Sequence, residues 1–230
     1  MRRPLDAVLV ECIRALIRRH PTFGDRKLGA LLRYGERLVV KLKAVCRILR
    51  AKRWLVPHRS VTPRPRVQGR RSIASVSDSR WAIDLTYIYC GVDGWGHLAA
   101  IIDCHDREIV GWEFNLRGRA REAQRALEQA RLHRLGTLRP EGPTPTSRSG
   151  NGLIFTARRF RAACRDYRLS QEFITPCTPE RNGTIERFFR SLKEECVWQH
   201  DFAGLVWACA AIRQWLRRYN ERRPHQALAT

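Results

Sequence analysis

Two acidic residues in this sequence stand where a carboxylate needs a chemical reason. Asp84 lies within the apolar segment RWAIDLTYI, and Glu186 lies within GTIERFFRSLKEE. A buried carboxylate without a partner is costly, so Asp84 should meet a cation, a hydrogen-bond cluster or water at a strand end. Glu186 falls in the first turn of an expected helix, where an acid is also a favourable partner for the helix dipole. Each acid taken alone therefore has a structural explanation beside a metal-binding one.

Basic residues accompany Glu186 along the expected helix. Arg190 and Lys193 follow it at four and seven positions, on the same helical face, and Arg187 is adjacent. An acid beside several cations suits a metal-bearing site that also binds phosphate groups.

The elements that would position these acids begin at Trp81. Three β-branched and aromatic segments, with the turn GVDGWG after the first, predict a strand meander over residues 81–115. Strand alternation places Asp84 on the face of Ala82 and Thr86. Helices and strands then alternate, which favours a mixed α/β sheet. The expected segments are a helix over 121–136, a short strand end at 152–155 followed by a helix capped by Thr156, a strand over 171–176, and helices from Asn182 and over 204–220.

The front of the chain carries most of the positive charge. The sequence holds 44 Lys and Arg against 22 acids, a net charge of +22, and residues 1–80 alone hold 21 against five, or +16. Such an excess indicates a polyanionic partner, either nucleic acid or an acidic membrane surface. No apolar run is long enough to span a bilayer, and the first 20 residues do not resemble a signal peptide.

Three helices are expected in this basic region. Leu9, Ile13 and Leu16 form one apolar stripe, and a second helix should stop at Gly35. In a third helix the apolar residues Leu38, Leu42, Val45 and Leu49 share one face, while basic residues point mainly away from it. This order is typical of a helix-turn-helix, whose last helix enters a major groove, although a plain three-helix bundle has the same pattern. The expected DNA-binding residues here are Lys41, Lys43, Arg47 and Arg50.

The composition suggests four parts. We expect a helical helix-turn-helix region over residues 1–58, a basic linker over 59–79, a catalytic core over 80–200, and a C-terminal helix with a shortened tail over 201–230. Eight scattered cysteines without a CxxC pair favour reduced, mostly buried thiols over zinc ligands or disulfides.

Five segments of this chain resemble a known family. RWAIDLTYI, AAIIDCHDREIVGW, NGLIFTARRF, TPERNGTIERFFRSLKEE and YNERRPHQAL are similar, in order and spacing, to the catalytic frame of insertion-sequence transposases of the retroviral-integrase superfamily. The front is similar to the helix-turn-helix that such transposases carry. The resemblance implies an α/β fold, an RNase H-like mixed sheet flanked by helices and preceded by a small all-α domain. It also implies Mg²⁺ or Mn²⁺ as cofactor, double-stranded DNA (element ends and target) as partner, self-association, and a place in the bacterial cytoplasm at the nucleoid.

The family's metal-binding triad is incomplete in this sequence. The triad consists of two Asp and a Glu; Asp84 matches the first Asp and Glu186 the Glu. Counting back 35 intervening residues from Glu186 reaches Gly150, within SGNG, where the family has Ser-Asp-Asn-Gly. Arg181 also replaces a usual Gln. Asp84 and Glu186 are thus the expected catalytic and metal-binding residues, with Arg187, Arg190 and Lys193 holding DNA phosphates.

The expected function follows from this pattern. The chain should be a transposase acting by two-metal phosphoryl transfer, with DNA nicking and strand transfer impaired because Gly150 replaces the second Asp. Glu141 or Asp103 could replace the lost ligand. The alternatives are a non-catalytic DNA-binding regulator of transposition and a nuclease on RNA–DNA hybrids.

Overall fold

The computed structural model describes residues 5–56, 74–175 and 182–223, and the chain divides into two compact units, residues 1–64 and 65–230. Most of the linker expected over residues 59–79 lies outside the described residues, as do Arg181 and the end of the chain. Each unit has its own hydrophobic core.

The first unit is a bundle of three helices, α1 (Ala7–Arg19), α2 (Asp25–Tyr34) and α3 (Leu42–Ala51). Their buried faces form one core, which includes Ile13, Leu28 and Ile48. The predicted stop of α2 at Gly35 is confirmed. The predicted start of α3 was wrong: the Leu38 amide donates to the Leu32 carbonyl, so the chain has not yet entered the helix there. Leu38 is consequently exposed, and the connection between α2 and α3 is longer than a tight turn.

The second unit contains a five-stranded mixed sheet. Its strands are β1 (Arg80–Tyr89), β2 (Trp95–Asp103), β3 (Ile109–Asn115), β4 (Thr146–Ser149) and β5 (Ser170–Phe173), in the spatial order β3-β2-β1-β4-β5. The first three strands form an antiparallel meander, as predicted, whereas β1 pairs with β4 and β4 with β5 in parallel. Strand β1 is therefore central and has neighbours of both orientations.

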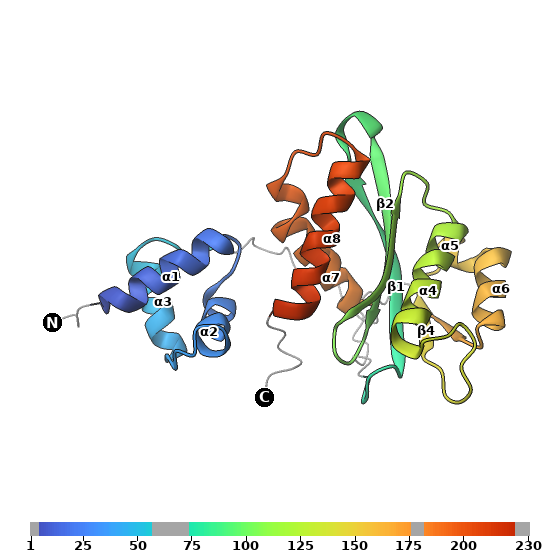
Figure 1. Ribbon diagram of the computed structural model, residues 1–230, viewed down its shortest axis with the longest axis horizontal. Coiled ribbons are helices and arrows are strands. Elements are labelled where there is room, and N and C mark those ends of the chain that lie inside the picture. Colours follow the sequence, from blue (N-terminus) through green and yellow to red (C-terminus); the bar gives the residue numbers. More distant parts are fainter. Residues whose placement is uncertain (1–4, 57–73, 176–181, 224–230) are drawn as a thin grey trace. The chain divides into compact units, whose positions relative to one another are not determined.

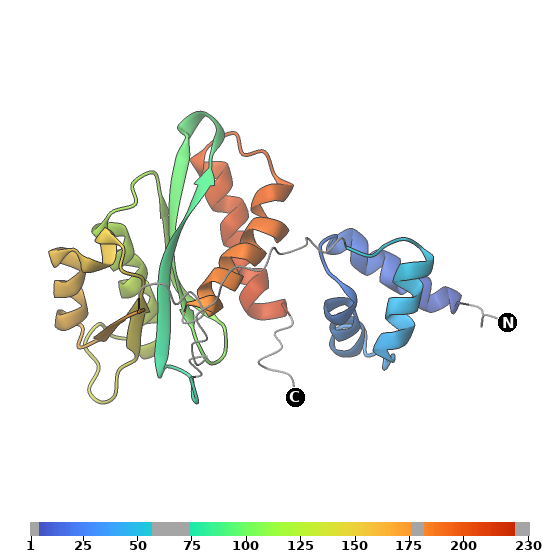
Figure 2. The same ribbon diagram turned by 180° about the vertical axis from the view of Figure 1, so that it is seen from behind.

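Helices cover both faces of this sheet (Figures 1 and 2). One face carries α4 (Ala120–Leu135), α5 (Leu153–Thr156) and α6 (Arg158–Asp166); the other carries α7 (Gly183–Glu195) and α8 (Leu205–Arg222). Two short 3-10 turns lie at Gly91–Asp93 and Val197–Gln199. Gly136 ends α4 in the left-handed region, at φ +67, as its position predicted.

Two predictions around residue 155 were wrong. The short strand precedes Gly150 as β4, and residues 153–156 form the single turn α5 instead of a strand end. Thr156 does not cap α6, because its hydroxyl donates back to the carbonyls of Gly152 and Leu153 and closes α5. The residue that precedes α6 is Ala157.

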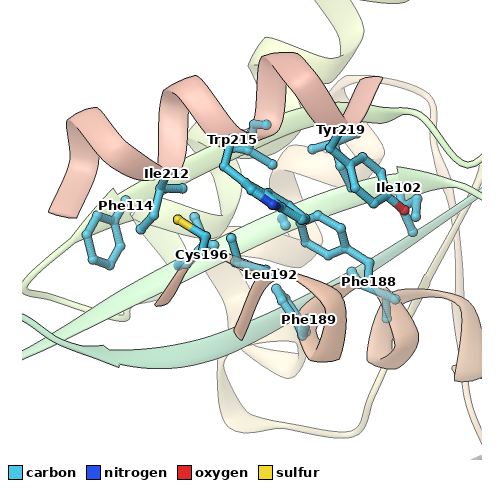
Figure 3. Packing of buried hydrophobic residues seen from close by; sticks show 14 of the residues in the cluster. Ile102, Phe114, Phe188, Phe189, Leu192, Cys196, Ile212, Trp215 and Tyr219 are labelled. Atoms are coloured by element: carbon cyan, nitrogen blue, oxygen red, sulfur yellow. The ribbon is translucent and has the colours of Figure 1, made fainter. Parts of the chain in front are cut away.

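An aromatic cluster fixes α7 and α8 on the sheet (Figure 3). Phe188 of α7 lies 5.2 Å from Tyr219 and 5.9 Å from Trp215 of α8, measured between ring centroids. Ile212 and Leu192 are fully buried in the same cluster. Helix α8, predicted as a separate C-terminal part, thus belongs to the core of the second unit.

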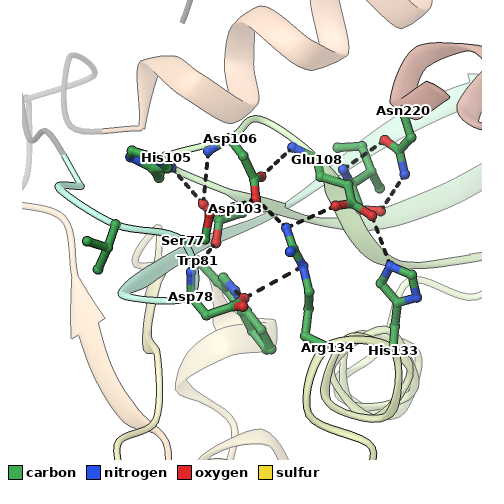
Figure 4. Close-up of polar contacts among 12 residues, drawn as sticks. Ser77, Asp78, Trp81, Asp103, His105, Asp106, Glu108, His133, Arg134 and Asn220 are labelled. Carbon is green, nitrogen blue, oxygen red and sulfur yellow. Dashed lines mark hydrogen bonds and ion pairs between the residues drawn. The ribbon is translucent and has the colours of Figure 1, made fainter. Parts of the chain in front are cut away.

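A polar network holds the turn between β2 and β3 (Figure 4). Asp103 accepts backbone N–H bonds from Asp78 and His105, both at 2.7 Å, and from Asp106 at 3.2 Å. Arg134 of α4 forms ion pairs with Asp78, Asp106 and Glu108. Asp103 therefore acts as the cap of a turn.

The cysteines of the described residues are consistent in position with the expected buried thiols. These seven cysteines are all free, and Cys90, Cys104, Cys164 and Cys196 are buried. Burial raises the pKa of the Cys164 thiol to about 12, which makes it a poor nucleophile.

The cluster of Figure 3 predicts a large stability effect. Phe188→Ala should lower the free energy of unfolding of the second unit by about 3–5 kcal/mol, because a buried ring is lost and a cavity remains. Urea denaturation followed by tryptophan fluorescence measures this change. Trp207→Ala, at an exposed position of α8, is the control and should change stability by less than about 0.5 kcal/mol. Equal stability of both variants would contradict the packing described.

Candidate metal and phosphate site

Asp84 lies in the middle of the central strand β1. Its neighbours on the same face, Ala82 and Thr86, are buried, and Asp84 itself is half-buried. The Leu85 amide donates to Asp84 Oδ1 at 2.9 Å. Burial raises the pKa of the Asp84 carboxyl, and the bond from Leu85 partly offsets this effect. The Leu85 amide thus holds the Asp84 carboxylate in place, but this one hydrogen bond does not offset the full cost of burying its negative charge.

Gly150 comes next to Asp84 through the sheet register. In the parallel pair of β1 and β4, Ile83 is opposite Ser149 in the last pair of this ladder, and Asp84 and Gly150 are the residues that follow this pair in each segment. A Cβ atom at Gly150 would meet nothing within 4 Å, and its φ lies outside the left-handed region. Neither space nor backbone conformation therefore requires glycine at this position.

Helix α7 brings Glu186 to the same place. Asn182 precedes α7, and its carbonyl accepts the Glu186 amide at 3.2 Å. The Asn182 side chain is buried and its Nδ2 donates to Asp84 Oδ2 at 3.3 Å. Arg107, from the turn after β2, donates to Thr184 Oγ1 at 2.7 Å and so ties the start of α7 to the sheet. One residue, Asn182, thus connects the strand acid with the helix acid.

The negative charges of Asp84 and Glu186 repel each other. Partial burial, and then the charge of Asp84, raise the pKa of Glu186. Two carboxylates whose pKa values are raised offer only oxygen donors, and a hard divalent cation such as Mg²⁺ or Mn²⁺ bound by both would offset their mutual repulsion. In addition, Asn182 Oδ1 is buried and has no hydrogen-bond partner among the described residues. The residues present fit a divalent cation.

The site has two acids and a gap. Across residues 5–56, 74–175 and 182–223, no group of three His, Cys, Asp or Glu side chains could hold a metal ion. Asp103 does not fill the gap, because it is opposite Trp81 in the sheet and binds three backbone amides. Glu172 of β5 is held by Arg148 at 2.9 Å and by Arg80 at 3.5 Å. Glu141 is exposed in the loop before β4.

The side chains of α7 that are expected to bind phosphate lie on different faces of the helix. Arg190 and Lys193 share the Glu186 face, whereas Arg187 is turned away by roughly 100°. Arg190 is exposed and paired with Glu194 at 2.8 Å, an interaction weak enough to exchange for a phosphate. In the first unit, Lys41, directly before α3, and Lys43, Arg47 and Arg50 within α3 are all exposed.

Asn182 is the residue that sequence reasoning missed. Its signal was present, because Asn directly before a helix is a preferred capping residue. Here, however, its side chain makes no capping bond within α7 and turns to Asp84 instead.

The raised carboxyl pKa values predict that the site destabilises the fold at neutral pH. A carboxyl whose pKa is higher in the folded than in the unfolded chain contributes stability below its unfolded pKa and loses it as pH rises through the folded pKa. Asp84→Asn removes this loss, and a rotated Asn182 amide can accept from the new Nδ2. Thermal unfolding without divalent cations should therefore show the variant more stable than the native chain at pH 7, with the difference shrinking toward pH 3. Glu141→Gln, at an exposed acid, is the control; a variant no more stable at pH 7 would contradict the burial argument.

Comparisons with known proteins agree with this architecture. Two family models, both described as integrase core domain, match residues 75–179 and 167–230. An uncharacterised 39.2 kDa protein of insertion element IS476 from Xanthomonas euvesicatoria is 29% identical over 224 residues, covering 97% of this chain. The transposase InsD of insertion element IS2 from Escherichia coli is 27% identical over 214 residues, covering 90% of this chain. The chain spans 61% and 71% of the lengths of these two relatives.

A solved structure supports the fold. A chain in the cryoEM structure of a simian T-cell lymphotropic virus intasome, in complex with a PP2A regulatory subunit, is 17% identical, with a TM-score of 0.52 over 95% of this chain and 72% of the other. At this identity the likeness concerns the fold alone, and it confirms the expected RNase H-like sheet flanked by helices after a helical front part. Together, the two integrase core matches over residues 75–230 and the insertion-element relatives support an insertion-sequence transposase with an integrase-type core.

Proposed function

We propose that this chain has the architecture of an enzyme of DNA transposition, with catalysis impaired by the loss of one metal ligand. The reaction is phosphoryl transfer: hydrolysis of one DNA phosphodiester frees a 3′-hydroxyl, which attacks a second phosphodiester. The observation that carries the proposal is the convergence of Asp84 and Glu186 through Asn182, with open space at Gly150 beside them. Double-stranded DNA is the proposed partner and the bacterial cytoplasm the proposed place of action.

Each residue of the site has a different proposed role. Asp84 and Glu186 would hold divalent cations, whose chemistry is to activate the attacking oxygen and stabilise charge on the leaving one. Asn182 orients the Asp84 carboxylate by its 3.3 Å hydrogen bond. Arg190 and Lys193, on the Glu186 face, would bind the DNA phosphate next to these acids, and Arg187 would bind a phosphate further away.

Gly150 weakens this arrangement at its centre. Loss of a group that only orients a metal ligand already costs about 10–100-fold in metal affinity or activity, and loss of a ligand itself should cost more. Glu172 and Asp103 are both engaged elsewhere, which supports a loss without replacement.

A second function does not need catalysis. The basic residues of α3 and the charge of +16 over residues 1–80 support duplex DNA binding by the first unit. A chain that binds element ends, and self-associates with active relatives, would act as a regulator of transposition.

None of the described helices is long and apolar enough to cross a membrane.

Restoring the missing acid should restore the site. Gly150→Asp should tighten Mn²⁺ binding by at least about tenfold, measured by titration calorimetry, and should raise Mn²⁺-dependent cleavage and joining of matching element ends. Gly24→Asp adds the same charge at an open position of the first unit and is the control. Native chain that joins strands as well as the Gly150→Asp variant would refute the impairment.

The basic face of α3 should dominate duplex binding. Replacing Lys43 and Arg50 together by Ala in the full chain should weaken duplex binding, and the slope of log affinity against log salt should fall by about 0.9 for each phosphate that is no longer neutralised. Fluorescence anisotropy over a salt series measures both quantities. Arg33→Ala, an exposed residue of α2, serves as the control. An unchanged slope in the double variant would count against α3 as the DNA-binding helix.

A further inference from the structure

Four aromatic rings form a ladder at the end of the β1–β2 hairpin. Tyr87 is opposite His97 and Tyr89 is opposite Trp95, with ring centroids 4.8 and 5.5 Å apart. Tyr87, Tyr89 and Trp95 are 56%, 57% and 61% exposed, although large aromatic side chains usually bury most of their surface. We define these four residues as the aromatic ladder.

The ladder occupies a stretch of sheet that no described helix of the second unit covers. On the same face of β1, Trp81 and Ile83 are buried in the cluster that includes residues of α4 and α6. On the opposite face, Thr86 and Ile88 between the ladder residues are buried, Ile88 in the cluster of α7 and α8. The sheet thus continues beyond the α4 layer with one face packed and the other exposed, and adjacent exposed rings on such a face mark a binding surface.

Arginines border the ladder. The backbone of Gly118 lies against the His97 ring, since a Cβ atom at Gly118 would come within 2.3 Å of His97 Nδ1. Arg117 and Arg119, on either side of Gly118, are exposed and form no salt bridge with any acid of the described chain.

The acids near the ladder are already engaged. Asp93, in the turn of the hairpin, accepts the Leu205 amide at 2.7 Å, and Glu113 is paired with Arg125 at 3.2 Å. The surface therefore presents aromatic rings and positive charge together. A second copy of this chain would bring like charges face to face, which disfavours self-association through this surface.

We propose that the aromatic ladder binds unpaired bases of a single DNA strand, with Arg117 and Arg119 on its phosphates. Successive rings on one strand face are roughly 6.6 Å apart, so Tyr87 and Tyr89 can each accept a different base. Stacking on exposed rings, with cations along the backbone, is how single strands are bound without sequence preference. The inference extends the proposed DNA binding to strands with unpaired bases and does not depend on the metal site.

The test separates stacking from charge. The full chain is titrated, without divalent cations, with a thymidine strand of about 20 nucleotides, long enough for one such site, and with an abasic strand of equal length and charge. The native chain should bind the base-bearing strand at least about tenfold more tightly. The double variant Tyr89→Ala, Trp95→Ala should lose this preference and keep its affinity for the abasic strand. Trp198→Ala, at a tryptophan of matching exposure (59%), should keep the preference.

Each outcome decides a different point. Equal affinity of the native chain for both strands, or a preference that survives the double variant, would overturn the ladder proposal. Failure of the native chain to bind either strand would also overturn the ladder proposal, whereas failure to bind a DNA duplex in a parallel titration would overturn the proposed DNA binding itself. Circular dichroism checks that the double variant is folded, and the variant Tyr89→Phe, Trp95→Phe, which keeps the rings, should retain the preference if the double variant does not fold.

Discussion

The packing of α7 against the β1 face of the sheet is the constraint on which the candidate site depends. Asp84 and Glu186 are 102 positions apart in the sequence, and their like charges oppose close approach. Burial of Phe188 against Trp215 and Tyr219 holds α7 in place, and the Arg107–Thr184 hydrogen bond fixes its start. Hydrophobic burial thus provides the free energy that keeps two carboxylates near each other without a cation. Such stored repulsion is characteristic of functional sites, where local stability is lower than the fold could achieve.

Gly150 is informative because the surrounding structure does not require it. Glycines elsewhere have local reasons: Gly136 adopts a left-handed backbone, and a side chain at Gly111 would collide with α4. At position 150 a Cβ atom would meet open space, one residue beyond the last pair of β4 with β1. This open space is what the proposed loss of a side chain would leave, and it agrees with a family resemblance in which Arg181 is the other departure noted.

Much of the fold could be predicted from the sequence, because its signals are local. The meander of β1 to β3 alternates clearly, Gly35 and Gly136 end helices as expected, and α7 begins after Asn182. Strand β4 could not be predicted, because its residues Thr-Ser-Arg-Ser are polar and owe their burial to the neighbouring strands β1 and β5. The Leu38 error has a similar cause: spacing alone does not show which apolar residues the tertiary packing will bury.

In the candidate site, too, some features could be predicted from the sequence and others depend on tertiary contacts. Motif order and spacing predicted Asp84, Glu186 and the gap at Gly150. They did not reveal the bond from Asn182 to Asp84, or the engagement of Asp103 by three backbone amides, since both depend on contacts between distant segments. The central claim, that Asp84 and Glu186 share one divalent cation, is tested most directly by the anomalous diffraction of Mn²⁺ in crystals of this chain. We predict an anomalous peak within coordination distance of both carboxylates, about 2.0–2.3 Å. A peak at other acids, or none beside Asp84 and Glu186 at saturating Mn²⁺, would contradict it.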